Sequence, residues 1–375
     1  MAKKHASKTA NKADYAVSKA TPDKRVKAPL LPYKPSRAKA YRPRIGIIGC
    51  GGIISTHLDA YKQAGYKVVA FQNRTRSKAE QVRDDYYPRA TVFDTVEELL
   101  ANPDIAIVDI ATHPAERVPI IAAAINAGKH VLSQKPFVED IAIGKKLVTA
   151  ARRKGLQLAV NQNGRWAAHV AYAREAIQAG LLGEVMSVDL AVHWDHNWCA
   201  GTPFDRIPQL VLYDFGVHWF DMVQCYLGAE KAKSVFATVC KSRSQLAKPP
   251  FLESAVVEYK HAQASIILRA DTRFGAQDRS VIVGSEGTLV CEGPNLNEQQ
   301  VTLYTQQGIA TPKLTTQWFP DGFDGTMSEL ICAIEAEREP SNSARENLRS
   351  LELCFSALRS AELGTPVKVG DVSSL

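Results

Sequence analysis

The fold is decided by residues 44–80, which read RIGIIGCGGIISTHLDAYKQAGYKVVAFQNRTRSKAE. A β-rich run at 45–48 enters a turn that contains Gly49, Gly51 and Gly52. The predicted helix and second strand follow at 53–62 and 68–71. Glycines let a pyrophosphate approach the backbone, and the helix N-terminus offers N–H groups and a positive dipole end. The pattern therefore predicts a dinucleotide-binding β-turn-α-β unit rather than an ordinary tight turn.

One position departs from the G-x-G-x-x-G/A pattern, because Ile54 stands where the third small residue is expected. A branched side chain there should push the helix away from the strand, unless the local geometry differs. We still expect the cofactor phosphates to contact Gly49, Gly51, Gly52 and Ile53.

The end of the second strand bears on the choice of cofactor. An acidic residue there would bind the adenosine ribose diol. This chain instead has Gln72, Asn73, Arg74, Thr75 and Arg76. Both arginines can pair with a 2′-phosphate, and Asn73 and Thr75 can donate to it. We therefore predict NADP in preference to NAD; the alternative is that these are solvated loop charges.

Strand and helix patterns alternate as far as residue 165, which predicts an α/β fold with a doubly wound, parallel Rossmann sheet. Ligands bind such sheets at the carboxyl ends of the strands. Gly49, Asn73, Thr112, Lys135 and Asn163 should lie at that edge. The candidate cofactor contacts beyond the glycine turn and the second strand are Ala111, Thr112, His113, Gln134, Lys135 and Arg165.

The second half of the chain has a different pattern of predicted secondary structure, in which strand-like runs joined by short turns precede a helical tail. This predicts a C-terminal α/β domain at 166–375 with a large, mostly antiparallel open sheet. The Rossmann domain is predicted at 41–165 and a basic, proline-containing arm at 1–40. An open sheet face favours a homo-oligomer, a dimer or a tetramer.

One helical stretch, QLVLYDFGVHWFDMVQCYLG at 209–228, interrupts the predicted strands. Asp214 and His218 are four residues apart and share a helical face. Gly216 stands between them, where glycine costs about 1 kcal/mol relative to alanine, so something should pack closely there. Taken alone, the pair fits either a catalytic role or an Asp–His pair satisfied within the core.

Five stretches together resemble the glucose–fructose oxidoreductase / inositol dehydrogenase / rhizopine-catabolism (Gfo/Idh/MocA) family. They are GIIGCGGI at 46–53, AGKHVLSQKPF at 127–137, DFGVHWFD at 214–221, GSEGTL at 284–289 and ALRSAELGTPVKV at 357–369. The resemblance covers about residues 42–368. It implies a Rossmann domain, an α/β domain with a large open sheet, and a catalytic cleft between them.

The resemblance also implies the catalytic residues. The family's Glu-Lys-Pro motif is matched by Gln134, Lys135 and Pro136, so the glutamate is replaced, and its Asp-x-x-x-His helix is matched by Asp214 and His218. Hydride transfer at an alcohol carbon also moves a proton, which requires a group of near-neutral pKa. His218 is the first candidate, since the unperturbed pKa is about 6.5, and Lys135 is the second. Lys135 would also stabilise a developing alkoxide, and Asp214 would orient the imidazole or bind substrate.

The stretch HWDHNW at 193–198 contains metal-ligand types. In a strand, however, His193 and Asp195 face one way and Trp194 and His196 the other, so we predict no metal site. Carboxylate and imidazole groups bind hydroxyls, and a tryptophan can cover an apolar ring face. We predict a substrate-binding rim; the alternative is a set of strand-end residues with local partners. The predicted substrate contacts are Lys135, His193, Trp194, Asp195, His196, Asp214 and His218.

Composition excludes some classes of function. The full chain has a formal net charge of +7, and residues 1–40 alone carry +9, so the remaining residues carry about −2. A body of nearly zero net charge gives no electrostatic footprint for nucleic acid. The sequence contains no run of 18 apolar residues, so we expect no membrane-spanning helix. Seven scattered cysteines with no CxxC pair predict reduced thiols and a cytoplasmic location.

The basic arm has no hydrophobic core of the kind found in a secretion signal, and its first part should be a solvated extension. The stretch LLPYKPSRAKAYRP at 30–43 has prolines and apolar anchors. We expect it to lie along the surface of the body or of a neighbouring subunit.

These observations lead to one main functional prediction, an NAD(P)-dependent oxidoreductase acting on a secondary hydroxyl or keto group of a sugar, a sugar derivative or a cyclitol. One alternative is a redox-assisted lyase, glycosidase or epimerase that retains its cofactor and works through a transient keto sugar. A second alternative is a non-catalytic NADP-binding sensor.

Overall fold

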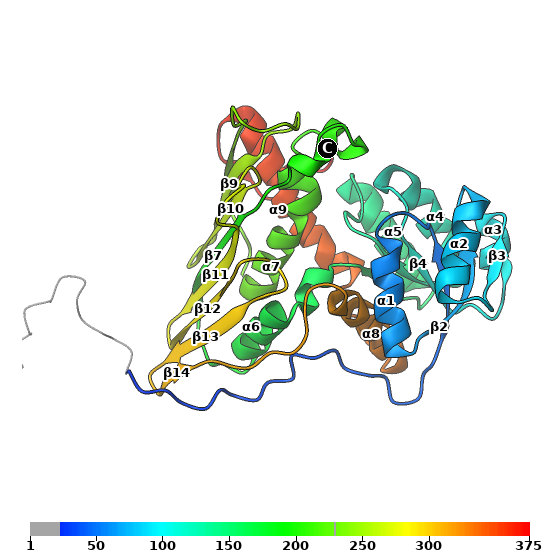
Figure 1. The fold of residues 1–375 in the computed structure, drawn as a ribbon, viewed down its shortest axis with the longest axis horizontal. Helices are drawn as coiled ribbons and strands as arrows, with labels where there is room; N and C mark the ends of the chain where they lie inside the picture. The colour runs from blue at the N-terminus through cyan, green and yellow to red at the C-terminus, as the bar shows by residue number, and fades with distance from the viewer. Residues whose placement is uncertain (1–22, 229) are drawn as a thin grey trace, which may run out of the picture.

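The structure is a computed structural model that describes residues 23–228 and 230–375. Two sheets organise the described chain: a six-stranded sheet of order β3-β2-β1-β4-β5-β6 and a nine-stranded sheet of order β14-β13-β12-β11-β7-β10-β9-β8-β15. Helices fill the space between them (Figure 1). The predicted fold class, a Rossmann sheet followed by a large open sheet, is confirmed.

The six-stranded sheet is parallel throughout. Its strands are β1 (Arg44–Ile48), β2 (Lys67–Gln72), β3 (Thr91–Phe93), β4 (Ile107–Ile110), β5 (His130–Ser133) and β6 (Leu158–Val160). The helices that connect them are α1 (Ile54–Ala64), α2 (Arg76–Tyr86), α3 (Val96–Ala101), α4 (Pro114–Asn126) and α5 (Ile141–Arg153). Parallel pairing brings the carboxyl end of every strand to one edge, where the predicted site residues follow.

The nine-stranded sheet is antiparallel except for the neighbours β7 and β10, which run parallel. Its strands are β7 (Val185–His193), β8 (Ser234–Cys240), β9 (Leu252–Glu258), β10 (Gln263–Arg269), β11 (Gln277–Gly284), β12 (Gly287–Gly293), β13 (Gln300–Thr305), β14 (Gly308–Ala310) and β15 (Val367–Lys368). The mostly antiparallel sheet of the prediction is therefore present.

One face of this sheet carries helices α6 (Ala168–Gln178), α7 (Val217–Leu227) and α9 (Ala344–Leu363), as Figure 1 shows. Along β7 the buried side chains are Val188, Leu190 and Val192, which alternate with more exposed neighbours. This period of two is what a sheet covered on one face requires. The opposite face carries no helix from the described part of the chain.

A late helix completes the core of the Rossmann domain. Helix α8 (Asp321–Glu335) lies against α1, and Phe323, Met327 and Leu330 share one hydrophobic cluster with Ile54 and residues of the sheet. Ile54 is 2% exposed. The branched side chain that breaks the glycine pattern therefore belongs to this shared core.

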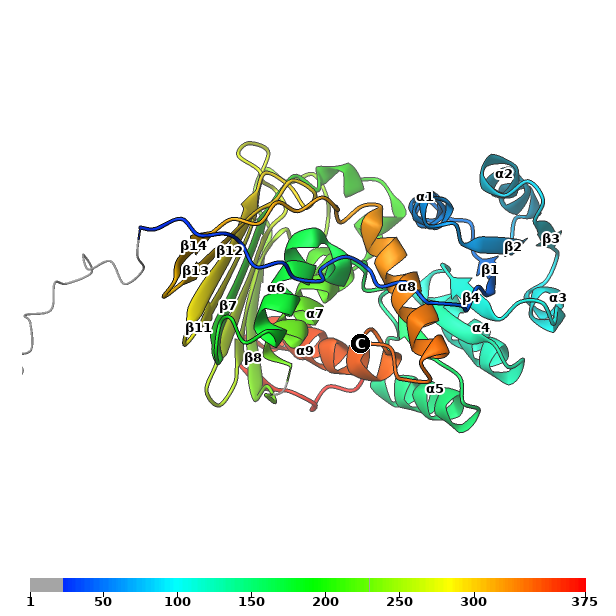
Figure 2. The ribbon, with the colours of Figure 1, turned by 90° about the horizontal axis from the view of Figure 1, so that it is seen from below.

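Residues 23–43 form an extended arm that runs from β14 past α6 and α8 to β1 (Figure 2). Val26 N–H donates to the carbonyl of Ile309 at 2.9 Å, and the hydroxyl of Tyr172 donates to the carbonyl of Pro29 at 3.1 Å. Near its end the carboxylate of Glu335 accepts backbone N–H groups of residues 39–41. The arm thus lies along the body of its own chain, and residues 1–22 are outside the described part.

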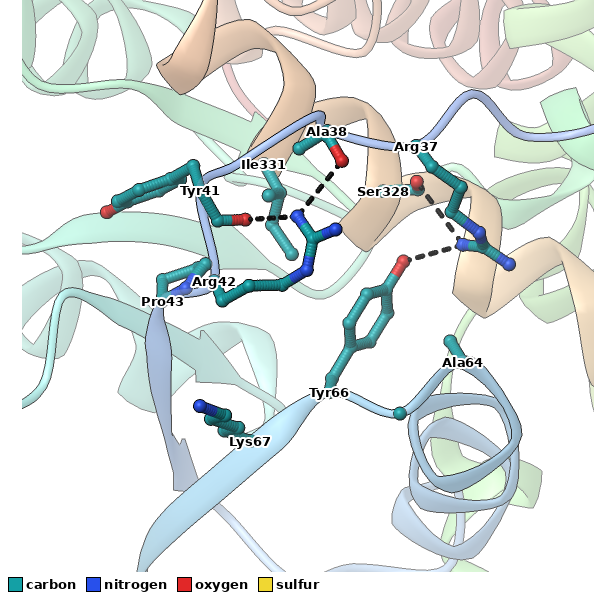
Figure 3. Close-up of a pocket in the computed structure, with 11 residues that line it drawn as sticks. Arg37, Ala38, Tyr41, Arg42, Pro43, Ala64, Tyr66, Lys67, Ser328 and Ile331 are labelled. Carbon is teal, nitrogen blue, oxygen red and sulfur yellow. Dashed lines mark hydrogen bonds between the residues drawn. The ribbon is translucent and has the colours of Figure 1, made fainter.

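A cavity of about 130 Å³ lies where the arm meets α1, β2 and α8 (Figure 3). The Arg37 guanidinium donates to the Tyr66 hydroxyl at 2.9 Å, and Arg42 donates to three arm carbonyls. Lys67 lines it at the start of β2, so the cavity lies at the amino edge of the sheet, opposite the strand ends of the predicted site. We therefore do not assign the chemistry to it. No helix in the described residues is long and apolar enough to cross a membrane.

Candidate active site

The glycine turn after β1 is open to a ligand on one side and closed on the other. Gly49 has φ of 99°, and a Cβ there would lie 2.9 Å from the carbonyl carbon of Ala111, so only glycine fits. A Cβ on Gly51 or Gly52 would meet nothing within 4 Å. Ile53 is 38% exposed beside them. The turn therefore has free space in front of its backbone, as a bound pyrophosphate requires.

The N-terminus of α1 has no side-chain cap. Its N-cap residue is Ile53, whose side chain cannot accept a hydrogen bond from the first-turn N–H groups. The N–H groups of Ile54 and Thr56 donate to the carbonyls of Gly51 and Ile53, so the helix offers an anion mainly its positive dipole end beside the open glycine turn. Asn73 shapes the turn from the neighbouring strand, because its Oδ1 accepts the N–H of Cys50 at 3.0 Å. These features fit the phosphates of a dinucleotide.

The two arginines after β2 already have carboxylate partners. Arg74 lies 2.7 Å from Glu116, with side chains 85% and 49% exposed. Arg76 lies 2.8 Å from Glu80 and 2.5 Å from Asp94. The sequence places no carboxylate in this loop, but the fold brings three from other positions. The pairs are exposed, and exposed pairs contribute little, so a phosphate can compete for Arg74.

Lys135 crosses from the first domain to the second. Its Nζ donates to the backbone oxygen of Asp214 at 2.7 Å and lies 3.2 Å from the Asp214 carboxylate. The two side chains are 17% and 18% exposed. The Phe215 ring centre lies 5.8 Å from the same nitrogen, a cation–π distance. The structure therefore brings the predicted Lys135 and Asp214 together at the carboxyl edge of the six-stranded sheet.

A π-helix presents Asp214 to this contact. Residues Val211–Phe215 form it, and α7 continues from Val217. A Cβ on Gly216 would lie 2.2 Å from the carbonyl oxygen of Leu212, so the group that packs closely on this glycine is the chain's own backbone. Single-turn π-helices are frequent at functional sites. The simple helical spacing of the prediction is thus replaced by a bulged turn.

His218 lies beside this pair on α7. The pKa of its imidazole is well below the usual range because the half-buried ring is desolvated and Lys135 adds a positive charge. Its Nδ1 is buried and has no hydrogen-bond partner among the described residues. The ring also contacts Trp318, with centroids 5.6 Å apart. At neutral pH, His218 is therefore an uncharged group with free hydrogen-bonding capacity.

The stretch after β7 divides between the two faces of the sheet. Trp194 and His196 have ring centroids 4.8 Å apart, and His196 lies 4.2 Å from the Phe215 ring that faces Lys135. Burial lowers the pKa of His196 to about 4, and both of its ring nitrogens are buried without a partner. His193 alternates onto the opposite face, in register with Arg269. The structure therefore does not bring His193 to Lys135.

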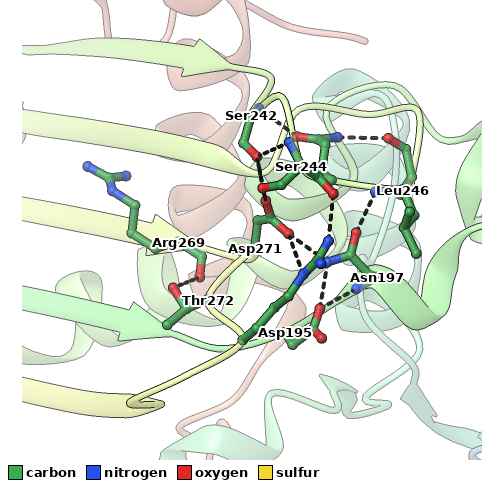
Figure 4. Close-up of polar contacts among 11 residues, drawn as sticks. Asp195, Asn197, Ser242, Ser244, Leu246, Arg269, Asp271 and Thr272 are labelled. Atoms are coloured by element: carbon green, nitrogen blue, oxygen red, sulfur yellow. Dashed lines mark hydrogen bonds and ion pairs between the residues drawn. The ribbon is translucent and has the colours of Figure 1, made fainter.

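Asp195 belongs to a polar cluster that fixes this loop (Figure 4). Its Oδ1 accepts the Nδ2 of Asn197 at 2.7 Å, and the same Nδ2 lies 2.7 Å from Asp271. The Asp271 carboxylate also accepts from Ser242 and Ser244. Asp195 thus has local partners, which is the alternative weighed from the sequence, and the cluster positions the adjacent His196.

The remaining predicted cofactor contacts differ in their surroundings. Arg165 is 5% exposed, and its side chain makes a two-point ion pair with Asp221 at 2.5 and 2.6 Å. Its third nitrogen donates to the carbonyl of Ser341. Arg165 was predicted as a cofactor contact, and in this structure its guanidinium is engaged by Asp221 and Ser341. Thr112 keeps a buried hydroxyl without a partner at the strand edge, and Ala111 and His113 flank it.

Arg117 is a site residue that sequence reasoning missed. It is 1% exposed, yet all hydrogen bonds of its guanidinium within the described chain go to backbone carbonyls and none to a carboxylate. It donates to the backbone carbonyls of Thr112, Gln134 and Pro136. One buried cation therefore fixes the loops after β4 and β5, which carry predicted site residues. The available signal was an arginine followed by an almost wholly apolar run in the same helix.

His57 and Asp109 were also missed. Both side chains are 0% exposed, and Nδ1 of His57 lies 2.8 Å from Oδ2 of Asp109. The signal was a carboxylate inside the apolar strand IVDI, since a buried charge normally requires a specific partner.

No group of three His, Cys, Asp or Glu side chains in the described residues could hold a metal ion.

The comparisons with known proteins agree with this architecture. The family description "Oxidoreductase family, NAD-binding Rossmann fold" matches residues 43–162, and "GFO/IDH/MocA C-terminal domain" matches residues 170–290. A two-domain oxidoreductase with an NAD-binding Rossmann unit is therefore the class that fold and site define. The chain belongs to the GFO/IDH/MocA family.

Curated relatives include the inositol 2-dehydrogenase of Rhizobium meliloti, 25% identical over 329 residues, 84% of this chain and 96% of that protein. The 1,5-anhydro-D-fructose reductase of Ensifer adhaerens is 25% identical over 339 residues, 87% of this chain and 98% of that protein. An uncharacterised oxidoreductase of Schizosaccharomyces pombe is 28% identical over 248 residues, 63% of this chain. In that match the chain spans about two thirds of the relative, 66% of its length.

Solved structures show the same fold. A levoglucosan dehydrogenase in complex with NADH and levoglucosan has a TM-score of 0.76 at 19% identity, over 88% of this chain and 100% of that chain. An oxidoreductase from Agrobacterium radiobacter, in complex with NAD+, L-tartaric acid and magnesium, has a TM-score of 0.79 at 19% identity, over 88% and 99%.

Proposed function

We propose that the protein is an NAD(P)-dependent oxidoreductase that acts on a secondary hydroxyl or keto group of a sugar, a sugar derivative or a cyclitol. The observation that carries this proposal is the contact of Lys135 with Asp214 beside the uncharged His218, at the strand edge that also bears the open glycine turn. A bound nicotinamide supplies the hydride acceptor or donor, and the chain supplies the proton transfer and the orientation of the substrate.

His218 is the proposed proton carrier. Because its pKa lies well below the usual value, the imidazole is neutral at pH 7 and can accept the proton of a substrate hydroxyl. Its buried Nδ1 has no partner among the described groups, so a hydrogen bond from substrate or water would satisfy it. In the reverse direction the protonated ring returns the proton to the keto oxygen.

Lys135 is the proposed electrostatic group. Its ammonium, held by Asp214, would donate to the substrate oxygen and stabilise the negative charge that develops there. Asp214 would keep the amine directed towards the proposed substrate position. These roles are proposals that rest on the Lys135–Asp214 geometry and on the family membership.

The substrate class is proposed from the wall next to Lys135. Trp194, His196 and Phe215 form adjoining aromatic contacts, and His196 has two unsatisfied ring nitrogens. An aromatic surface with an unpartnered imidazole suits a ring that carries hydroxyl groups. The relatives named for inositol, D-apiose and 1,5-anhydro-D-fructose support the same class.

NADP is the proposed preferred cofactor. Arg74 is 85% exposed in a surface ion pair, so its guanidinium can turn from Glu116 to a 2′-phosphate at low cost. Asn73 and Thr75 offer polar groups next to it, although Asn73 also supports the glycine turn. The neighbouring Asp94 and Glu116 oppose a second negative charge, so the preference should be moderate rather than absolute.

A homo-oligomer is proposed to form through the open sheet face. Phe236 on β8 and Val256 on β9 are register partners on this face, and they are 41% and 38% exposed. A second copy of the chain would cover such apolar positions. The seven free cysteines support the proposed cytoplasmic location, because a reducing compartment keeps thiols unpaired.

The proposed function is tested by one spectroscopic assay. Purified protein is mixed with NAD or NADP and with myo-inositol, levoglucosan, D-apiose or D-glucose, and absorbance of the reduced nicotinamide is followed. Substrate-dependent reduction that is lost in Lys135→Ala supports the proposal. Absence of reduction and of the reverse oxidation with every compound in an extended sugar panel would overturn it, and cofactor that co-purifies and is never released would favour the redox-assisted lyase or epimerase.

A further inference from the structure

A buried chain of hydrogen bonds connects the core of the six-stranded sheet to the loop that carries Lys135. It starts at Asp109 on β4, whose Oδ2 lies 2.8 Å from Nδ1 of His57 on α1. Nε2 of His57 lies 3.1 Å from Nε2 of Gln134 and 3.2 Å from Nδ2 of Asn161. Oε1 of Gln134 then accepts the backbone N–H of Lys135 at 2.7 Å.

The donors and acceptors along this chain fix its protonation. The amide nitrogens of Gln134 and Asn161 can only donate, so Nε2 of His57 must accept. Nδ1 therefore carries the hydrogen and donates to Asp109. The Gln134 amide is held in this orientation from its other side, because the backbone N–H of Lys135 can only donate to Oε1. The Oδ1 of Asn161 lies 3.0 Å from the Thr326 hydroxyl, which can donate to it. The His57 ring is thus in the form that carries its hydrogen on Nδ1 and accepts at Nε2.

We infer that the Asp109–His57 pair is a positioning unit for Lys135 that acts through Gln134. It orients the Gln134 amide, and the amide holds the backbone N–H from which the Lys135 side chain reaches Asp214. This inference rests on the proposed function, because it gives the unit a purpose only if the Lys135 ammonium acts on substrate. His57, Asp109 and Gln134 touch no substrate in this scheme.

Arg117 completes the support from the other side of the same peptide segment. Its guanidinium donates to the carbonyls of Gln134 and Pro136, which flank Lys135. The N–H of Lys135 is held by the Gln134 side chain, and the flanking carbonyls are held by Arg117. Two independent buried groups thus restrain this short loop, which is what precise placement of a long, flexible side chain requires.

The same arrangement explains the glutamine at position 134. The family resemblance leads one to expect glutamate there. Nε2 of His57 accepts, so a carboxylate facing it would place two acceptors against each other unless the ring gained a proton. An amide donates to the ring and accepts from Lys135 at the same time. Glutamine therefore suits a His57 ring that accepts at Nε2 and already pairs with Asp109.

The test uses two variants that interrupt this series of hydrogen bonds at different points. Gln134→Met removes the amide and keeps the shape, whereas His57→Leu combined with Asp109→Asn removes the imidazole without leaving a buried unpaired carboxylate. Tyr61→Phe is the matched control, since the Tyr61 hydroxyl also donates to Oδ2 of Asp109, at 2.7 Å, but does not lie between Asp109 and Lys135. Each change is made with Lys135 present and in Lys135→Ala.

We expect Gln134→Met and the His57/Asp109 double variant each to lower kcat at least about tenfold when Lys135 is present, measured with a substrate identified in the sugar panel. In the Lys135→Ala background the same changes should lower kcat less than about threefold. In cofactor-free protein labelled with 15N-lysine, hydrogen exchange of the Lys135 N–H should accelerate about tenfold or more in the same variants and remain unchanged in Tyr61→Phe. A purely structural role would lower activity by the same factor in both backgrounds.

Equal losses in both backgrounds, or unchanged exchange of the Lys135 N–H in both variants, would overturn the inference. If Lys135→Ala itself leaves turnover unaltered, the proposed role of Lys135 fails instead, and the exchange measurement still decides whether the chain restrains this loop. Should the His57/Asp109 double variant not fold, Gln134→Met alone carries the same comparison.

Discussion

Lys135 and Asp214 meet between the two domains, with the lysine Nζ 2.7 Å from the aspartate backbone oxygen and 3.2 Å from its carboxylate. One partner follows a strand of the parallel sheet, and the other lies on a π-helix of the second domain. The contact therefore joins the domains at the place where substrate is proposed to bind. A substrate oxygen must share or replace one of these two hydrogen bonds.

Lys135→Ala should lower kcat by a factor of about 10² or more, because it removes the cation that stabilises charge on the substrate oxygen. Lys145→Ala is the control, since that lysine is 64% exposed in a pair with Glu352. Steady-state kinetics with the panel substrate measures both. A Lys135→Ala enzyme with kcat within threefold of the parent would remove lysine from the proposed mechanism.

His218→Gln should remove the acid limb of the pH–rate profile. The pKa of His218 lies well below the usual value, so the ring is neutral at pH 7 and gains a proton only at a pH clearly below 6.5. In the direction of alcohol oxidation, kcat/KM should therefore fall as the pH drops through that pKa. The variant should be slower by about 10²-fold or more and show no such fall. An unchanged acid limb would assign it to another group.

His169 should make the fold sensitive to acid. It is 4% exposed, and burial lowers its pKa to about 4. The unfolded chain binds a proton near pH 6.5, so this group lowers stability as the pH falls from 6.5 towards 4, by about 2 kcal/mol at pH 5. Urea unfolding at pH 7 and pH 5 should show that His169→Phe loses about 2 kcal/mol less than the parent.

Asp278 gives a control of opposite sign for that experiment. Burial raises its pKa to about 7, so the folded state binds the proton and stability is lost as the pH rises through 7. Asp278→Asn should therefore gain less stability than the parent on acidification from pH 7 to pH 5. If both variants follow the parent, these groups do not titrate as buried side chains.

Arg74 should govern the choice between the two cofactors. Arg74→Ala should lower kcat/KM for NADP about tenfold and leave the value for NAD within about threefold, because only NADP offers the 2′-phosphate. Glu116→Gln should shift the ratio the other way, since it frees the guanidinium and removes a negative charge. Arg83→Ala, in the last turn of α2, is the control. Equal losses with both cofactors after Arg74→Ala would contradict the assignment.

Asp221→Asn should destabilise the protein without altering the cofactor-binding groups. The side chains of Arg165 and Asp221 are 5% and 2% exposed in their ion pair. Removal of one partner leaves the other charge buried and unpaired. The expected loss in the free energy of unfolding is about 3–5 kcal/mol. At a temperature where the variant is folded, its Kd for NADP should match the parent. A large change in Kd would support Arg165 as a cofactor contact.

The first domain and the position of Lys135 at the edge of its sheet were accessible from sequence for a physical reason. The glycine turn and the alternation of strands and helices are local patterns, and parallel strands must end at one edge. The pairing of Lys135 with Asp214 joins residues that are 79 positions apart. Residue order alone does not fix that distance, and it was reached only through the family resemblance.

Three features were not accessible in this way. The π-helix at Val211–Phe215 depends on backbone bonds that the periodic spacing of Asp214 and His218 does not reveal. The partners Glu116 and Asp94 approach the arginines from other loops, so the absence of a nearby acid in the sequence was misleading. Arg165 seemed available because its partner Asp221 lies on a distant helix.

The arm also bears on how the edge of the large sheet avoids pairing with a strand of another molecule. Ile309 on the outermost strand β14 accepts the N–H of Val26 at 2.9 Å and donates to the carbonyl of Lys24 at 2.9 Å. The arm thereby occupies backbone groups that would otherwise recruit a strand from another molecule. A shortened chain that begins at Pro43 would leave the backbone groups of β14 unpaired at the edge of the sheet. We expect this shortened protein to aggregate even though every residue of the proposed active site is retained.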